Sequence, residues 1–252
     1  MWKLVFGSVQ GTSHVRSGQP CQDYCAGTVT GTTLVVACAD GAGSAEFSQL
    51  GSKAAVDRFL EVASCDEVPT KEQVEAWIEV ARERLIEAAE ANGSTPRQFA
   101  CTFLAALVGD GWAAFAQLGD GVIVFDGPDG YDFPFWPDNG EYANTTRFLS
   151  EDDHRQHLRI EIVKRNVSEL AVLTDGLQML ALDIAGAKVH DRFFAPLFKA
   201  VRNGPDEAVL QASLLEFLGS KRVNERTDDD KTLLLATRIT ADVPPNLPDA
   251  TA

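Results

Sequence analysis

The 252-residue sequence predicts an α+β fold in which strands and helices form separate layers. Runs such as 34–38 and 170–173 are apolar throughout, which is typical of strands that are buried on both faces. Strands, a helix pair, more strands and more helices follow one another along the chain, and this order favours α+β over a parallel, doubly wound sheet. With 45% hydrophobic and 23% charged residues, the chain can bury a sizeable core.

The first part of the chain is expected to contain two strands followed by two helices. The second helix is the best defined, because Thr70 and Gln73 form a capping box, Asn92-Gly93 ends the segment, and apolar residues recur at helical spacing between them. The predicted elements are a strand at about 2–9, a Gly/Ser/Pro-rich loop at 11–20, a strand at about 32–39, and helices at about 48–63 and 70–91.

The second part is expected to return to strands and then to helices. Gly119-Asp120-Gly121 predicts a turn inside the apolar stretch 112–126. The predicted elements are strands at about 100–108 and 112–126, a long loop at 127–144, strands near 159–165 and 169–174, helical segments at about 176–202 and 205–218, and a last strand at about 231–239. We expect a single domain over residues 1–240 and a flexible, proline-rich tail over 241–252.

Net charge and cysteine usage restrict the classes of partner. The charge of −15 and the sequence pI near 4.6 argue against nucleic acid and against anionic membrane surfaces as partners. The five cysteines are odd in number and form no zinc-type CxxC pairs, which favours reduced thiols. No signal peptide or membrane-spanning apolar run is apparent, so we expect a cytoplasmic protein, and we expect a monomer.

Four short stretches set an aspartate beside glycine or another acid at the mouth of an apolar run. They are Asp40-Gly41-Ala42-Gly43, Gly119-Asp120-Gly121, Thr174-Asp175-Gly176 and Asp228-Asp229-Asp230. Each alone has an ordinary interpretation, as a tight turn, a hairpin turn, a helix cap or a solvated acidic turn. Burying several ionised carboxylates at the ends of strands costs free energy unless a positive charge neutralises them. Their convergence would form a set of oxygen ligands suited to Mg²⁺ or Mn²⁺.

The order of these stretches, with Pro20-Cys21-Gln22-Asp23 upstream, resembles the metal-dependent Ser/Thr protein phosphatases of the type 2C (PPM) family. The resemblance spans roughly residues 7–238. Segments 11–14, 140–146 and 223–227 look like those of a bacterial subgroup called PphC-like phosphatases. The resemblance implies a four-layer αββα sandwich of two antiparallel sheets flanked by helix pairs, with helix 70–91 antiparallel to helix 48–63 on one outer face.

The resemblance also implies a set of metal ligands. Asp40 matches the aspartate that bridges two cations, Gly41 the residue whose carbonyl binds one of them, and Asp175 and Asp229 the other ligands of the first metal. Asp120 matches an acid that, with Asp175, holds a third, weaker ion. We therefore expect the carboxyl oxygens of Asp40, Asp175 and Asp229 to converge within about 5 Å of a common point. Asp40 and Asp175 are the expected catalytic residues.

Several positions depart from the family pattern. Gln22 stands where a glutamate helps to hold the second metal, and Asp23 matches an acid that orients waters near it. Asp230 stands where asparagine is usual, so it is not counted as a ligand. Two further positions lack the family residue: Gly18 replaces a phosphate-gripping arginine, for which Arg16 or His14 could substitute, and Ala42 replaces a histidine found in many members.

The implied function is hydrolysis of phosphomonoesters on Ser/Thr-phosphorylated proteins. A hydroxide bridging two Mn²⁺ or Mg²⁺ ions would attack phosphorus, since a bound metal lowers the pKa of water to about 7. An alternative is a pseudophosphatase that acts as a phosphopeptide-binding or scaffold module, which Gln22, Gly18 and Ala42 favour and the intact aspartates oppose. A second alternative is a plain acidic cation-binding protein, which the ordered motifs disfavour.

Overall fold

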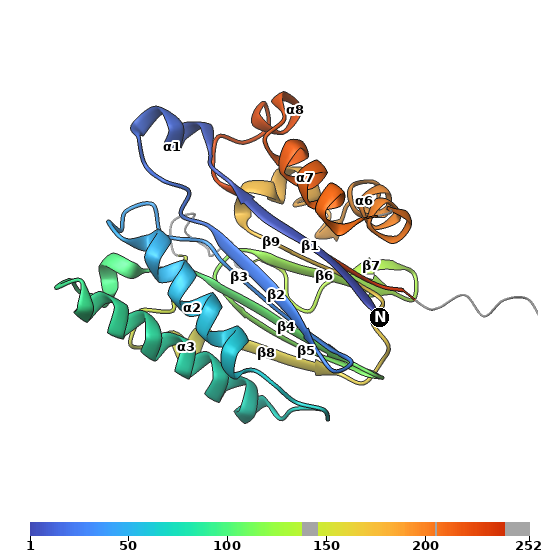
Figure 1. The fold of residues 1–252 in the computed structure, drawn as a ribbon, viewed down its shortest axis with the longest axis horizontal. Coiled ribbons are helices and arrows are strands. Elements are labelled where there is room, and N and C mark those ends of the chain that lie inside the picture. The colour runs from blue at the N-terminus through green and yellow to red at the C-terminus, as the bar shows by residue number, and fades with distance from the viewer. Residues whose placement is uncertain (138–145, 205, 240–252) are drawn as a thin grey trace, which may run out of the picture.

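The computed structural model describes residues 1–137, 146–204 and 206–239. In this part of the chain two antiparallel five-stranded sheets face each other, and a helix pair covers each outer face (Figure 1). The predicted four-layer αββα sandwich is therefore confirmed. The predicted tail at 241–252 and most of the 140–146 motif lie outside the described residues.

One sheet has the strand order β1-β12-β9-β6-β7, and the other has the order β2-β3-β4-β5-β8. The first comprises β1 (Trp2–Val9), β12 (Lys231–Arg238), β9 (Glu169–Leu173), β6 (Val122–Gly127) and β7 (Gly130–Asp132). The second comprises β2 (Tyr24–Thr30), β3 (Thr33–Ala39), β4 (Phe103–Gly109), β5 (Trp112–Leu118) and β8 (Arg159–Val163). Every strand expected from the sequence is present, while β2 and β7 were not expected. β2 lacks a continuous apolar run because its far half is exposed.

The sandwich arrangement explains why strand β3 is apolar throughout. Leu34, Val36 and Cys38 point into the core between the two sheets. The alternate residues Val35 and Ala37 pack instead into the core beneath the helices. Both faces of the strand are buried, so no position favours a polar side chain.

The helices cover the two sheets in the predicted manner. Helices α2 (Ser48–Val62) and α3 (Lys71–Ala91) lie side by side and antiparallel over the second sheet (Figure 1). The capping box is present, since Thr70 Oγ1 accepts from Gln73 N and Gln73 Oε1 accepts from Thr70 N. Helices α6 (Asp191–Asn203) and α7 (Glu207–Leu218) pack on the first sheet. No helix in the described ranges is long and apolar enough to cross a bilayer.

Three local predictions need correction. The loop at 11–20 contains a short helix, α1 (Thr12–Ser17). The segment 176–202 is not continuously helical: a small hairpin interrupts it before α6. The remaining short elements are η1 (Pro96–Phe99), α4 (His154–His157), η2 (Asp175–Leu177), α5 (Gln178–Ala181), β10 (Leu182–Asp183), β11 (Lys188–Val189) and α8 (Lys221–Asn224).

The third correction concerns Gly119-Asp120-Gly121, which is not a hairpin turn. Strands β5 and β6 belong to different sheets, so these three residues carry the chain across the sandwich. Gly119 adopts a φ of 101°, and a Cβ there would lie 2.6 Å from the Thr102 side chain. Glycine is thus required for this crossover, and the crossover leaves Asp120 at the edge between the two sheets.

Candidate metal centre

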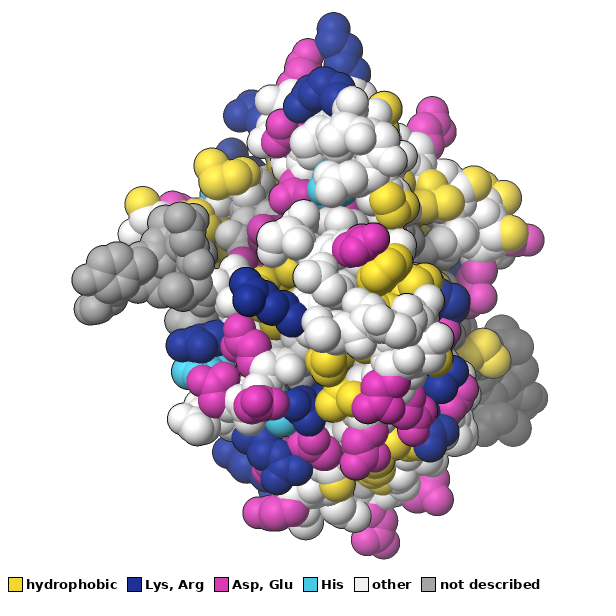
Figure 2. Space-filling view, turned by 90° about the vertical axis from the view of Figure 1, so that its left-hand side faces the viewer, with side chains coloured by type: hydrophobic (Ala, Val, Ile, Leu, Met, Phe, Trp, Pro, Cys, Tyr) yellow, Lys and Arg dark blue, Asp and Glu magenta, His cyan; other side chains and the backbone are white. Residues whose placement is uncertain are grey.

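The aspartate motifs meet at one end of the sandwich. Asp40 follows β3, Asp175 follows β9, and Asp229 precedes β12. Within the first sheet, the antiparallel register brings the ends of β6, β9 and β12 together, since Val122 and Leu233 both pair with Leu173 at the end of β9. Asp40 comes from the facing sheet. Figure 2 views this end of the molecule, where acidic and basic side chains are interspersed over its lower half.

Three carboxylates form a tight group at this end. One oxygen from each of Asp40, Asp120 and Asp175 lies within 4.8 Å of the others. The group borders a cavity of about 300 Å³, whose other lining residues are Ser13, His14, Gln22, Gly41, Ala42, Gly43, Thr102, Thr146, Phe148 and Asp229. The cavity is thus lined largely by oxygen-bearing side chains.

Hydroxyl groups hold two of these aspartates in place. Thr102 Oγ1 accepts a hydrogen bond from Asp40 N at 3.0 Å, and Thr102 N donates to Asp40 O at 2.8 Å. Thr146 Oγ1 donates to Asp120 Oδ2 at 2.8 Å. Thr102 was not singled out from the sequence, and Thr146 entered only as the last residue of the 140–146 segment, with no role assigned. Thr102 had one visible signal, a lone hydroxyl between apolar residues at the mouth of β4.

The carboxylates raise one another's pKa. Burial, followed by the charges of Asp120 and Asp229, raises the pKa of Asp175 to about 6. Burial, followed by the charges of Asp23 and Asp175, raises the pKa of Asp40 well above its usual range. Such crowding disfavours the ionised forms, and a cation at the centre of the group would relieve it.

Asp23 lies beneath this group and is almost fully buried. Its Oδ2 accepts hydrogen bonds from Thr174 Oγ1 at 2.7 Å and from Thr232 Oγ1 at 2.8 Å. Burial is the main cause that raises the pKa of Asp23 to about 7, and the charge of Asp230 adds to it. Asp23 is therefore held by two strand ends and stands behind the cavity, outside its lining.

The donor set fits a hard divalent cation. Gln22 and Asp120 line the cavity, and Gln22 Oε1 and Asp120 Oδ1 are buried with no hydrogen-bond partner among the described residues. Buried oxygens without a partner are uncommon, and a bound ion is one ordinary explanation. Carboxylate and amide oxygens are also the ligands that Mg²⁺ and Mn²⁺ prefer. Gly41 lines the cavity, where a Cβ would lie 2.8 Å from Gln22 O, so only glycine fits this close approach.

Asp229 and Asp230 have different surroundings. Asp229 is exposed and lines the cavity, although it does not join the three carboxylates within 4.8 Å. Asp230 is buried, and its two oxygens accept from Gly11 N and Gln22 N, each at 2.6 Å. The tightest group therefore consists of Asp40, Asp120 and Asp175, while Asp229 stays a predicted ligand in the cavity lining. Asp230 ties two loops to the start of β12.

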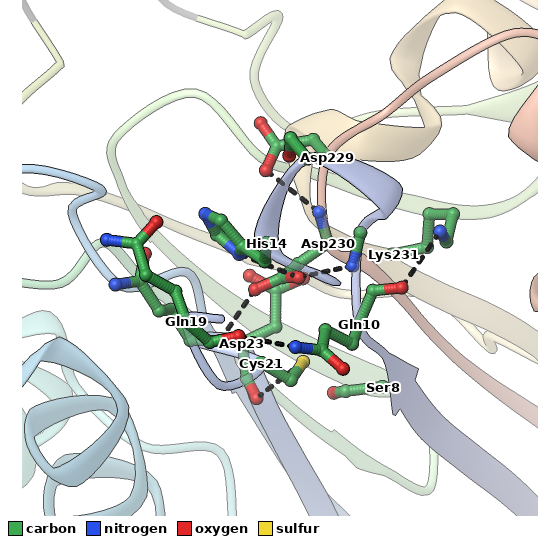
Figure 3. A network of polar contacts seen from close by, with 12 residues as sticks. Ser8, Gln10, His14, Gln19, Cys21, Asp23, Asp229, Asp230 and Lys231 are labelled. Atoms are coloured by element: carbon green, nitrogen blue, oxygen red, sulfur yellow. Dashed lines mark hydrogen bonds and ion pairs between the residues drawn. The ribbon is translucent and has the colours of Figure 1, made fainter. Parts of the chain in front are cut away.

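The two candidates for binding phosphate are placed differently. His14 lines the cavity, and its Nδ1 lies 3.0 Å from Asp230 Oδ1 (Figure 3). Arg16 is exposed, pairs with Asp228 at 3.0 Å, and is absent from the cavity lining. The structure thus brings His14, and not Arg16, to the three carboxylates.

Comparison with known proteins supports the resemblance to protein phosphatases that the sequence motifs indicated. Residues 10–219 match the family described as Protein phosphatase 2C. The chain is 36% identical to Serine/threonine-protein phosphatase 3 of Escherichia coli (strain K12), over 93% of this chain and 98% of that protein. The Streptococcus agalactiae serine/threonine phosphatase has a similar fold, with a TM-score of 0.65 and 15% identity over 95% of this chain and 100% of that one. RsbX in complex with magnesium has a TM-score of 0.58 and 17% identity over 94% of each chain.

The fold, the carboxylate group and these similarities define a metal-dependent protein phosphatase. The chain belongs to the protein phosphatase 2C family. The family and the enzyme class expected from the sequence are confirmed, and neither the comparisons nor the described residues favour the pseudophosphatase alternative.

Proposed function

We propose that this protein hydrolyses phosphoserine and phosphothreonine esters of proteins, with Mn²⁺ or Mg²⁺ held by Asp40, Asp120 and Asp175. The convergence of these three carboxylates on one cavity is the observation that carries the proposal. Asp229 and the carbonyl of Gly41 complete the ligand set. The E. coli relative, named as a serine/threonine-protein phosphatase, supports the class of substrate.

Divalent cations supply an activated water for attack on phosphorus and positive charge for the phosphoryl oxygens. The protein residues provide the preorganisation of that charge. Asp40 and Asp175 are fixed at the ends of two facing sheets, so their positions do not depend on substrate binding. Asp23 is held by Thr174 and Thr232 behind the cavity, where it is placed to orient metal-bound water.

His14 is the proposed contact for the phosphate group. Its Nδ1 lies 3.0 Å from Asp230 Oδ1, so the carboxylate orients the imidazole ring. In Figure 3 the other ring nitrogen points away from Asp230. An imidazole N–H at the cavity wall can donate to a phosphate oxygen, which is the task implied for the arginine that Gly18 replaces.

Gln22 sets the expected metal preference. Its neutral amide replaces a carboxylate and removes one negative charge from the neighbourhood of the second cation. Mn²⁺ has the higher affinity for such mixed ligand sets and does not share the strict octahedral demand of Mg²⁺. We therefore propose that Mn²⁺ activates the enzyme better than Mg²⁺, and that the protein is a cytoplasmic monomer with one domain over residues 1–240.

The test is hydrolysis by protein that has been stripped with EDTA. Phosphoserine, phosphothreonine and phosphotyrosine peptides and a small aryl phosphate are supplied with no metal, with Mg²⁺ or with Mn²⁺. The proposal expects no turnover without metal, and with Mn²⁺ turnover of the aryl phosphate and of the Ser/Thr peptides in preference to the phosphotyrosine peptide. Equal turnover with and without metal, or none under any condition, would overturn it.

A further inference from the structure

A second and larger cavity adjoins the metal centre. Its volume is about 650 Å³, within the range of about 300–1,000 Å³ that is usual for ligand sites. Ala42 and Phe148 line both cavities, so the two are neighbours. The other lining residues are Ser44, Thr95, Pro96, Arg97, Gln98, Ala100, Ser150, Glu151 and Asp152.

Arg97 projects from a turn that is fixed on both sides. The turn is η1, whose Gln98 Oε1 accepts from Glu46 N at 3.0 Å and whose Gln98 O accepts from Phe47 N at 2.8 Å. Phe99 is fully buried and packs against Phe47 with ring centroids 5.4 Å apart. The backbone beneath Arg97 is therefore rigid, and only the exposed side chain has freedom to adapt.

The charged side chains that line this cavity differ in whether they form ion pairs. Glu151 lies 3.6 Å from Arg147, and Asp152 lies 3.4 Å from Arg82. Arg97 forms no ion pair with any residue in the described ranges. Arg97 is also the one Lys or Arg among the described residues that line this cavity. At physiological ionic strength, charges more than about 8 Å apart are largely screened from each other. A substrate group in contact with Arg97 therefore responds mainly to this arginine and not to the net charge of the protein.

We propose that the second cavity holds the polypeptide beside the phosphorylated residue, and that Arg97 binds an acidic side chain of that polypeptide. The inference rests on the proposed function and deepens it, because it assigns a substrate class: phosphoproteins with Asp or Glu close to the phosphorylated Ser or Thr. A planar guanidinium suits a carboxylate because it can donate two parallel hydrogen bonds.

The test compares phosphoserine peptides that differ at one position near the phosphate, where they carry Glu, Ala or Lys. Each position within about four residues on either side is varied in turn, since each residue of an extended chain spans about 3.3–3.6 Å. Wild-type enzyme is expected to hydrolyse the best Glu peptide with a kcat/KM about three- to tenfold above that of its Ala counterpart, mainly through KM. A preference for Lys at every position, or no preference, would overturn the inference.

Variants separate the role of Arg97 from general charge effects. Arg97→Ala should abolish the preference for Glu, and Arg97→Glu should transfer it to the Lys peptide. Both should hydrolyse the small aryl phosphate within about twofold of wild type, because that substrate does not reach the second cavity. Arg84→Ala is the matched control, since Arg84 is an exposed arginine of α3 that lines neither cavity.

The outcomes distinguish two failures. If the variants keep the wild-type ratios among the three peptides while Mn²⁺-dependent turnover persists, the role of Arg97 is wrong and the proposed function stands. If wild-type enzyme hydrolyses neither the aryl phosphate nor any peptide with Mn²⁺, the proposed function fails and the inference fails with it.

Discussion

Asp229 and Asp230 are adjacent in the chain but lie on opposite sides of the backbone at the start of β12. Asp229 faces the carboxylate cavity, and Asp229 Oδ1 accepts a hydrogen bond from Asp230 N at 2.8 Å. Asp230 turns inward, where its carboxylate accepts from the amides of Gly11 and Gln22. It also lies beside the ring of His14 (Figure 3). One acid thus contributes charge to the cavity, and its neighbour holds together the loops that form the cavity wall.

The role of Asp230 predicts a stability effect. Asp230→Ala leaves two buried backbone N–H groups without acceptors, and we expect a loss of about 2–4 kcal/mol in the free energy of unfolding. Asp230→Asn keeps one acceptor and the side-chain volume, so it should lose less than half as much. Urea denaturation measures both variants. An Asp230→Ala variant as stable as wild type would contradict this role.

Gly176 predicts a steric effect at the same junction. A Cβ at this position would lie 1.9 Å from Asp230 O, which is backbone and cannot easily move. Gly176→Ala should therefore displace the start of β12, lower stability by about 1–3 kcal/mol, and reduce turnover. In the control Gly43→Ala, the nearest atom to the added Cβ is Gln22 Oε1 at 3.9 Å, and stability should not change. Equal melting temperatures for the two variants would refute the steric account.

The raised pKa values predict how pH affects the metal-free protein. Asp175 and Asp23 bind protons more tightly when folded, with pKa values of about 6 and 7, than when unfolded. Their contribution to stability is therefore complete below the unfolded pKa near 4 and is lost as pH rises through 6–7. In EDTA, we expect the melting temperature to fall by about 3–8 °C between pH 5 and pH 8.

Saturating Mn²⁺ should remove or reverse this slope, because a cation favours the ionised carboxylates. Differential scanning fluorimetry across this pH window, with and without Mn²⁺, is the measurement. A metal-free protein that becomes more stable from pH 5 to pH 8 would show that the carboxylates do not repel one another as described.

Gln22→Glu tests the account of the second cation. The added carboxylate increases the negative charge beside the cavity, so the Mn²⁺ concentration for half-maximal activity should decrease by about tenfold, equivalent to about 1.4 kcal/mol. The control variant Gln22→Ala removes the amide oxygen, and it should increase the Mn²⁺ concentration for half-maximal activity. An unchanged metal dependence in Gln22→Glu would show that Gln22 is not close to a bound cation.

Local sequence patterns predicted most of the helices and strands, because the signals for these elements are local, whereas the four-layer arrangement was implied by the resemblance to the type 2C family. The capping box at Thr70 and the apolar runs of the central strands gave elements within a few residues of their observed bounds. The helical prediction for 176–202 was wrong in its middle, where Leu182 pairs with Val189 in a small hairpin. Helix-forming residues surround that hairpin, so its strand pairing is a tertiary effect that overrides local propensity.

The spatial arrangement of the site was harder to predict from local sequence patterns. A hairpin turn and a crossover between sheets both suit Gly119-Asp120-Gly121, and only the packing of the two sheets selects the crossover. The position of Asp120 beside Asp40 follows from that choice. His14 and Asp230 are in contact although more than two hundred residues separate them in the sequence, and no pattern around either residue predicts the contact.

The most direct test of the metal centre is Asp175→Asn, which removes one of the three clustered carboxylates and keeps the shape of the side chain. Mn²⁺ binding by calorimetry and Mn²⁺-dependent hydrolysis of a small aryl phosphate are measured on the same preparations. We expect weaker Mn²⁺ binding, at least about a 100-fold loss of turnover, equivalent to about 2.7 kcal/mol, and a metal-free melting temperature equal to or slightly above that of wild type. A variant that binds Mn²⁺ as wild type does and keeps more than about a tenth of its turnover would contradict the assignment of Asp175 as a ligand.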